Sequence, residues 1–386
     1  MCLNHSTAHH PVFCIVPPFI LQSIAEHGSV KQKECAISTL RATAQFRGER
    51  RFEPLIRSLE GIQVQPGITR RVYSAQNRTT LPGVLVRSEG DPPGTDVAVN
   101  EAYDGAGNTY DLYHEVYNRD SIDNAGMDIE SVVHYGTGYD NAFWNGRYMV
   151  YGDGDEDLPE AQRLFNRFTI ALDVIGHELT HGVVSYTANL YYYDQSGALN
   201  ESMADVFGIL TKQRTLHQTA AESDWVIGSG LFTPNVQGVG IRSMSNPGTA
   251  YNDPILGRDP QPGHMDNYVN TTQDNGGVHI NSGIPNRAFY VTALEIGGNA
   301  WEKAGRIWYV TLRDQLTARA TFQQAADHTY SVAGSLFGSG SLEQQAVRLG
   351  WREVGIHTGS EPPPTPPGDN KGCLPTVASL LRSRQS

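Results

Sequence analysis

The feature that most constrains this chain is the stretch GHELTHG, from Gly176 to Gly182. Apolar residues recur at three- and four-residue steps from Glu160 to Ser185, which predicts one long helix with this stretch well inside it. Side chains four residues apart on a helix lie on the same face, so His177 and His181 would present two imidazoles to one metal ion, with Glu178 beside them. The pattern indicates a zinc hydrolase, although a surface helix with two solvated histidines would contain the same letters.

A second segment supplies what the two histidines lack. Zinc at a catalytic site needs a third protein ligand, and GALNESMAD contains Glu201, twenty residues after His181. One helical turn further on, Asp205 lies on the same face as Glu201, where it could accept the outer N–H of a zinc-bound histidine and fix its tautomer. The alternative is that both carboxylates only complement the positive end of their own helix dipole.

The composition describes a globular chain with an acidic surface. Its 386 residues are 39% hydrophobic and 18% charged, which is enough apolar material for two lobes with their own cores. The 29 Lys and Arg residues against 41 Asp and Glu give a formal net charge of −12, and the sequence contains no basic run with interleaved aromatic residues. We therefore expect no nucleic-acid partner. No apolar run reaches the roughly 20 residues of a membrane span.

The cysteines and the N-terminal residues bear on location. The four cysteines are Cys2, Cys14, Cys35 and Cys373, so a catalytic core stapled by disulfides is excluded. The first ten residues, MCLNHSTAHH, lack the Lys or Arg of a signal peptide, and the apolar FCIVPPFIL after them is short and interrupted by two prolines. We expect a protein that is either secreted without a recognisable signal peptide or cytoplasmic.

Hydrophobic periodicity divides the chain into a strand-rich and a helix-rich part. Residues 17–45 read as two short amphipathic helices separated at Gly28, with apolar positions at Ile20, Leu21, Ile24, Cys35, Ile37 and Leu40. From about Arg70 to Asp155, Val- and Tyr-rich pieces between turn signals predict a mainly β lobe: RRVYSAQ, GVLVRS, SVVHYG and YMVYGDGDED. After Gln195, helical segments dominate up to about Gly350: GALNESMADVFGILTK, NRAFYVTALEIGG, GRIWYVTLRDQL and SLEQQAVRLGWREVG. The later segment EPPPTPPGDN is expected to be extended and unpacked.

The motifs together resemble a known family. HELTH followed by GALNESMAD is similar to the thermolysin-like neutral metallopeptidases, and NAFWNG (141–146), IRSMSNP (241–247) and DNGGVHINSG (274–283) match that family in the expected order. The resemblance covers roughly Tyr73 to Gly355. It implies an α+β fold: a two-lobed thermolysin-like zincin with a β-rich N-terminal lobe, a mainly α-helical C-terminal lobe and the zinc helix between them.

The N-terminal module resembles one branch of that family. FCIVPPFILQSIAEHG is similar to the short Pro-Pro-containing propeptide of the protealysin-like branch, and the alternative is an ordinary helix pair that caps the lobe. As a propeptide it would inhibit the enzyme intramolecularly, with residues 15–24 in the apolar cleft, until the connector is cut at sites such as Arg51–Phe52 or Pro54–Leu55. The implied division is a short propeptide over 1–50, a connector over 51–69, a β-rich catalytic lobe over 70–186 that ends in the HELTH helix, a helical lobe over 187–356 and a Pro-rich tail over 357–386.

The resemblance also implies catalytic roles. His177, His181 and Glu201 would bind one catalytic Zn²⁺, and Glu178 would take a proton from the water on that ion and deliver it to the leaving amine. His279, oriented by Asp274, and Tyr192 would donate hydrogen bonds to the developing oxyanion. Tyr191 and Tyr193 flank Tyr192, so a one-residue slip in this assignment stays open.

Further positions would bind substrate. Asn141, the main chain of Ala142 and Arg242 would hold the substrate backbone as an added strand, although Arg242 could equally form a structural salt bridge. An apolar pocket would accept Leu, Ile or Phe just after the cut, and one or two of its positions could be ordinary core residues. The pocket positions are Phe165, Phe168, Val174, Ile227, Leu231 and Ile241.

The chain departs from the family at its paired calcium site. Asp173 and Asp224 remain, but Lys212, Val226 and Ser229 stand where carboxylates are expected. Lys212 could neutralise Asp173 directly, so that a side-chain charge replaces a metal charge. We therefore do not expect the paired calcium site to be retained.

Two rival functions can be tested on the sequence. A zinc aminopeptidase would need an upstream Gly-x-Met-x-Asn segment to capture the free amine, and none precedes His177. A catalytically dead zinc fold that acts only as a binding protein would be expected to lack Glu178 or His279, and both are present. The expected protein is thus a monomeric zinc metalloendopeptidase that acts on peptides and proteins.

Overall fold

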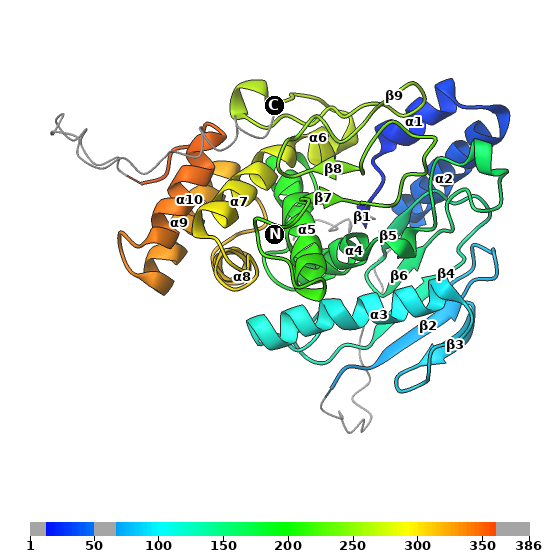
Figure 1. Cartoon of the computed structure of the whole chain (residues 1–386), viewed down its shortest axis with the longest axis horizontal. Coiled ribbons are helices and arrows are strands. Elements are labelled where there is room, and N and C mark those ends of the chain that lie inside the picture. Colours follow the sequence, from blue (N-terminus) through cyan, green and yellow to red (C-terminus); the bar gives the residue numbers. More distant parts are fainter. Residues whose placement is uncertain (1–12, 50–66, 360–386) are drawn as a thin grey trace, which may run out of the picture.

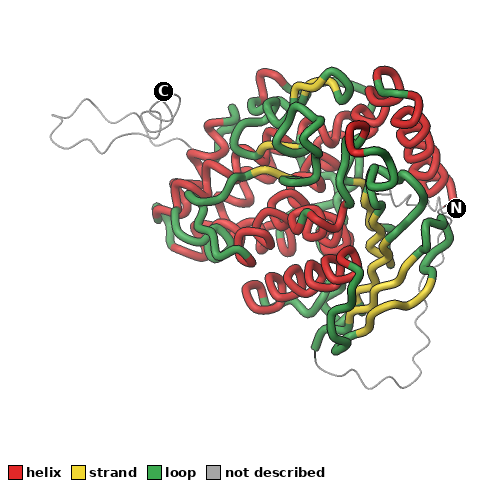
Figure 2. Tube along the Cα trace, turned by 45° about the vertical axis from the view of Figure 1, so that its right-hand side comes forward, coloured by secondary structure: helices red, strands yellow, loops and turns green. Residues whose placement is uncertain are grey.

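The computed structural model describes residues 13–49 and 67–359. Strands gather on one side and most helices on the other, with α4 (Leu172–Ser185) and α5 (Asp194–Thr215) between them (Figure 1). Figure 2 shows the same separation from a second direction, with the N-terminal helix pair on the side of the strands.

The strand-bearing lobe contains a six-stranded sheet in the order β1-β5-β6-β4-β2-β3. Strand β4 pairs in parallel with both β2 and β6, and the other pairs are antiparallel. Four of the six strands coincide with the four predicted pieces, whereas β1 was not predicted. The strands are β1 (Phe13–Cys14), β2 (Arg70–Ser74), β3 (Val84–Ser88), β4 (Ile129–Val133), β5 (Ala142–Trp144) and β6 (Tyr148–Tyr151).

A long helix in the strand-bearing lobe was also missed. Helix α3 (Val97–Asp111) contacts the sheet and α4, and it continues into a π-helical turn over Leu112–Val116. Its two glycines weaken the helical pattern in the sequence. Gly105 lets α3 approach α4 closely, because a Cβ there would lie 2.4 Å from the Cδ1 of Ile175.

The predicted single helix from Glu160 to Ser185 is wrong in its first half. That half contains two 3₁₀ turns, Glu160–Gln162 and Phe168–Ile170, and α4 begins only at Leu172. The backbone between the turns is held in other pairings: Phe165 forms a β-bridge with Phe232, and the Asp155 carboxylate accepts the N–H of Phe165. Tertiary contacts therefore override the helical spacing of these apolar residues.

The second lobe is helical, as predicted. Four of its helices match the predicted segments, and α6 and α9 were not predicted. The helices after α5 are α6 (Asp274–Asn281), α7 (Gly283–Ile296), α8 (Ala304–Asp314), α9 (Phe322–Phe337) and α10 (Leu342–Glu353). Two short strand pairs, β7 (Val226–Ile227) with β8 (Arg242–Ser243) and β9 (Asn252–Asp253) with β10 (Gly257–Arg258), complete the fold. Within the described residues, no helix is both long and apolar enough to cross a bilayer.

The helices α4 and α5 meet backbone to backbone. A Cβ on Gly208 would lie 2.4 Å from the carbonyl oxygen of Asp173 and 3.0 Å from the backbone nitrogen of His177. On the other helix, a Cβ on Gly176 would lie 3.0 Å from the Cα of Gly208. Only glycine permits this approach, and the approach brings the side chains of the two helices to one site.

The N-terminal module forms the helix pair α1 (Pro18–His27) and α2 (Val30–Glu49), which breaks near Gly28 as predicted. The three predicted apolar positions of α1 are buried. In α2 the prediction is partly wrong, because Ile37 is 38% exposed and Ala36, Thr39 and Thr43 are buried instead. With 20 residues, α2 is also longer than expected.

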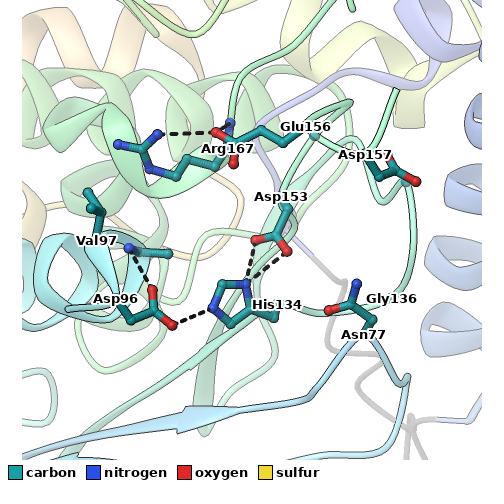
Figure 3. Close-up of a pocket in the computed structure, with 12 residues that line it drawn as sticks. Asn77, Asp96, Val97, His134, Gly136, Asp153, Glu156, Asp157 and Arg167 are labelled. Carbon is teal, nitrogen blue, oxygen red and sulfur yellow. Dashed lines mark hydrogen bonds and ion pairs between the residues drawn. The ribbon is translucent and has the colours of Figure 1, made fainter. Parts of the chain in front are cut away.

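A pocket of about 300 Å³ lies at the N-terminal end of α3 (Figure 3). Asp96 caps α3 by accepting the N–H groups of Ala98 and Val99. The ring of His134 bridges two carboxylates, with Nε2 2.9 Å from Asp96 Oδ2 and Nδ1 2.9 Å from Asp153 Oδ2. The hydrogen bond that the His134 ring donates to Asp153, followed by the one it donates to Asp96, raises the pKa of His134 to about 9 against the opposing effect of burial.

This bridge predicts a pH-dependent contribution to stability. The pKa of His134 is higher in the folded chain than the ordinary value of about 6.5, so its contribution is complete below pH 6.5 and is lost as the pH rises through about 9. We expect His134→Gln to lower the free energy of unfolding by about 1 kcal/mol at pH 6, after allowance for solvent screening, and by much less at pH 9.5. Thermal unfolding across this range measures the difference, with His328→Gln on α9 as control. A cost that does not change with pH would contradict the assignment.

Candidate metal centre and catalytic site

Helices α4 and α5 bring the three predicted metal ligands together. One ligand atom each from His177, His181 and Glu201 lies within 4.8 Å of the others, and all three side chains are fully buried. The two Nε2 atoms are 3.0 Å apart, and each lies 3.5 Å from an oxygen of Glu201.

The hydrogen bonds of the Nδ1 atoms of His177 and His181 indicate that the group of two histidines and Glu201 suits a cation. Nδ1 of His177 lies 2.8 Å from Asp205 Oδ1, and Nδ1 of His181 lies 2.8 Å from the amide oxygen of Asn200. Both acceptors require an Nδ1–H, which leaves two Nε2 lone pairs facing each other. Among the described residues, Oε2 of Glu201 also has no hydrogen-bond partner. Two imidazoles and one carboxylate form a typical catalytic zinc set, so these residues fit Zn²⁺.

Asp205 connects the histidine group to Arg242 and Asn286. Its carboxylate accepts two hydrogen bonds of 2.8 Å from Arg242 and one of 2.8 Å from the amide of Asn286, in addition to its contact with His177. Burial alone would raise the pKa of Asp205, but Arg242 and His177 together bring it well below its ordinary value. The predicted position of Asp205 beside a ligand histidine is therefore observed, and so is the alternative salt bridge of Arg242.

Sequence reasoning missed Asn200 and Asn286. Asn200 directly precedes Glu201 in α5, which is a weak signal because neighbouring helical residues point in different directions. Asn286 lies 81 residues beyond Asp205, and its pairing has no local signature.

Glu178 lies in the centre of the site. Its Oε2 accepts the backbone N–H of Trp144 at 3.0 Å, and its Oε1 has no hydrogen-bond partner within the described part of the chain. Burial, followed by the nearby charge of Glu201, raises the pKa of Glu178 well above its ordinary value. A carboxylate in this environment is well suited to accept a proton.

His279 and Tyr192 lie together on the opposite side. Nδ1 of His279 is 2.6 Å from Asp274 Oδ1, and its Nε2 is 3.2 Å from the hydroxyl of Tyr192. The Tyr192 hydroxyl also donates a short hydrogen bond to Glu201. Tyr191 and Tyr193 are 54% and 43% exposed, whereas Tyr192, between them, is buried beside Glu201 and His279.

The groove along β5 holds the chain's own segment Phe13–Val16. Strand β1 pairs antiparallel with β5, the Asn141 side chain binds both main-chain groups of Val16, and Arg242 Nη1 donates to the carbonyl of Ile15 at 3.1 Å. We expected residues 15–24 in the cleft. Among the described residues, the segment along β5 is instead Phe13–Val16, and the chain turns helical at Pro18 because two prolines suit the start of a helix.

The six predicted pocket residues are all buried. Ile15, in the segment that lies along β5, is also completely buried. Figure 1 shows β1 lying next to β5 and α4.

Lys212 occupies the place of the expected calcium ligands. Its Nζ lies 3.0 Å from Asp173 Oδ2 and 3.0 Å from both oxygens of Asp224, and it donates to the carbonyl of Val226 at 3.1 Å. The predicted neutralisation of Asp173 by Lys212 is therefore confirmed. Burial would lower the pKa of Lys212, but Asp173 and Asp224 raise it, so the side chain is a cation.

Comparisons with known proteins agree with this geometry. The family model described as thermolysin metallopeptidase, catalytic domain, matches residues 62–185, and the model of the alpha-helical domain of the same peptidases matches residues 188–356. An extracellular metalloprotease of Pectobacterium carotovorum subsp. carotovorum is 47% identical over 91% of this chain and 98% of its own length. Protease PrtS of Photorhabdus sp. (strain Az29) is 48% identical over 90% of this chain and 93% of its own length.

A solved structure extends the agreement to the N-terminal module. The precursor of protealysin, a metalloproteinase from Serratia proteamaculans, is 48% identical and matches with a TM-score of 0.80 over 89% of this chain and 99% of its own. The predicted two-lobed α+β architecture is confirmed. This chain therefore belongs to the thermolysin metallopeptidase family.

Proposed function

We propose that this chain is a zinc endopeptidase made in a latent form, which hydrolyses peptide bonds on the amino side of bulky apolar residues. The observation that carries the proposal is the segment Phe13–Val16. An extended backbone lies along β5, between His279 and Arg242, with one apolar side chain buried beside the metal centre. A substrate peptide would add to the sheet in the same way.

Each residue then has a chemical task. His177, His181 and Glu201 hold Zn²⁺, which when bound lowers the pKa of a water and polarises a carbonyl group. Glu178 accepts a proton from the attacking water and transfers it to the leaving nitrogen. The Nε2–H of His279 and the hydroxyl of Tyr192 donate to the developing oxyanion, while Asp274 keeps the His279 ring oriented. Asn141, Ala142 and Arg242 hold the peptide backbone in register.

The groove favours an endopeptidase over an aminopeptidase. The backbone that occupies it continues in both directions, with twelve residues of sequence before Phe13 and the α1 helix after Val16. An aminopeptidase groove would end at a group that binds the free amine. The retained Glu178 and its unpaired oxygen among the described residues argue against a catalytically dead binding protein.

We further propose that residues 1–50 form an inhibitory propeptide, joined by a connector over 51–69 to the catalytic lobes 70–186 and 187–356. Most of the connector, including both expected cleavage sites, and nearly all of the tail over 357–386 lie outside the described residues. Because the Pectobacterium relative is named an extracellular metalloprotease, we propose that the mature enzyme acts outside the cell. We propose that it does so as a monomer.

Glu178→Gln tests the catalytic assignment. Glu178 is not one of the grouped ligand residues, so the variant should keep its zinc, measured by elemental mass spectrometry, while losing at least about 10²-fold in kcat/KM on an apolar peptide. Glu353→Gln on α10 is the matched control and should keep full activity. Near-native hydrolysis by metal-replete Glu178→Gln would refute the role.

Lys212 leads to a test of metal dependence. We propose that zinc is the only ion needed, so a calcium-selective chelator should leave the melting temperature nearly unchanged. Lys212→Met should cost about 3–5 kcal/mol, because it leaves the buried Asp173 without its cation. Lys31→Met, at an exposed ion pair, is the control. A fall of more than about 10 °C on calcium removal alone would contradict the proposal.

Maturation gives a third test. The wild-type chain should trim itself to begin between about Arg47 and Val72, whereas Glu178→Gln should stay full length. Intact-mass spectrometry of both proteins after equal incubation measures this. Full activity in a chain that still carries residues 1–45 would mean that the helix pair is a permanent cap.

A further inference from the structure

We infer that the Cys14–Ile15 peptide bond is held in the position at which this enzyme cuts, and that the latent chain hydrolyses this bond in itself. The inference rests on the proposed peptidase function. It adds a cleavage site far from the connector, inside the segment that fills the groove.

The direction and register of the segment are fixed by backbone hydrogen bonds. In the β1–β5 pair, Phe13 lies opposite Trp144 and Cys14 opposite Phe143. The N–H of Ile15 then donates to the carbonyl of Ala142 at 3.3 Å. The groove thus holds a continuous backbone with one defined set of partners for each residue.

One carbonyl of this backbone faces the oxyanion donors. The carbonyl oxygen of Cys14 lies 3.2 Å from Nε2 of His279, which is itself 3.2 Å from the Tyr192 hydroxyl. The next carbonyl, that of Ile15, instead faces Arg242 at 3.1 Å. The bond that follows the Cys14 carbonyl is therefore the one placed for attack.

The residues on both sides of the bond are anchored. On the amine side, Ile15 is completely buried, its backbone N–H donates to the carbonyl of Ala142, and its carbonyl accepts from Arg242. On the acyl side, the Phe13 ring stacks on His181 with a centroid distance of 4.2 Å and meets the Tyr192 ring edge-on at 4.8 Å. Ile15 also matches the preference for a bulky apolar residue after the cut.

The step is an ordinary hydrolysis. A water oxygen forms a bond to the carbonyl carbon of Cys14, and the bond from that carbon to the Ile15 nitrogen breaks. Glu178 accepts a proton from the water and passes it to the departing nitrogen. The second water proton also ends on the new amine, so the products are a Cys14 carboxylate and an Ile15 ammonium group.

The cut should be slow and partly reversible. After it, the new amine remains tethered through α1, whose Ile20, Leu21 and Ile24 are buried against the catalytic lobe. A leaving group that cannot diffuse away stays beside the acyl group and can attack it again. Among the described residues, the fragment 1–14 contacts the groove only through β1. Once this fragment dissociates, the bond cannot be formed again and the cut is permanent.

The test uses the zinc-loaded full chain, freshly purified, followed by intact-mass spectrometry in H₂¹⁸O. We expect a species that begins at Ile15 while still attached to the catalytic lobes, and a partner fragment that ends in an ¹⁸O-labelled Cys14 carboxylate. The rate should not change over a 100-fold dilution. The full-length Glu178→Gln chain, mixed with wild type and distinguished by isotopic labelling, should stay uncut at this bond.

Two substitutions test the register. Ile15→Asp should slow the cut at least tenfold, because it puts a charge into the apolar pocket, whereas Ile15→Leu should retain it. Ile37→Asp, at the exposed position of α2, is the matched control and should cut at the wild-type rate. If Ile15→Asp does not fold, the inference is tested by the cleavage rate of Ile15→Leu and by the ¹⁸O label in the Cys14 carboxylate.

The outcomes separate this inference from the function on which it rests. Cleavage of an external peptide by the matured enzyme without any chain that begins at Ile15 would overturn the inference and leave the peptidase function intact. Cleavage of the labelled Glu178→Gln chain at the wild-type rate would overturn the intramolecular step. Failure to cut any peptide would refute the proposed function itself.

Discussion

The site depends on the carboxylate of Asp205. This buried group in α5 contacts His177 from α4, Arg242 from β8 and Asn286 from α7. A carboxylate removed from water needs such partners, because its desolvation otherwise costs several kcal/mol. The same charge therefore orients the ring of His177 and positions the arginine that donates to the carbonyl of Ile15. His177 and Arg242 thus share one buried carboxylate. A substitution of either residue would therefore disturb the position of the other.

The groove itself follows from an incomplete sheet. Without β1, strand β5 would be an edge with unpaired N–H and C=O groups, and such an edge pairs with any extended backbone of suitable side chains. In this chain the occupant belongs to the same molecule. An attached segment acts at an effective concentration in the millimolar range, so a weak contact over Phe13–Val16 is enough to fill the groove. The inhibitor and the substrate would compete for the same hydrogen bonds, which is why the segment resembles a substrate in register and direction.

Much of the site could be predicted from local patterns. The spacing of His177 and His181 on one helix, and of Glu201 and Asp205 on the next, gave the common face of each pair directly, since helical geometry places side chains four residues apart on one face. The family resemblance chose Tyr192 over its two neighbours, and burial agrees with that choice. The replacement of calcium ligands by Lys212 was likewise visible in the sequence, because a cation beside Asp173 has an evident electrostatic role.

Other features were decided only by the tertiary structure. Helix α4 starts at Leu172 and not near Glu160, because the Asp155 carboxylate and the bridge to Phe232 hold the preceding backbone in another conformation. The partners Asn286 and Arg242 reach Asp205 from distant parts of the chain, and β1 finds β5 across more than a hundred residues. The local spacing of residues therefore indicated which side chains could bind a metal, and the family resemblance implied which residues would perform hydrolysis. Which backbone fills the groove, and which bond of it meets the catalytic groups, was decided by long-range packing that no local pattern encodes.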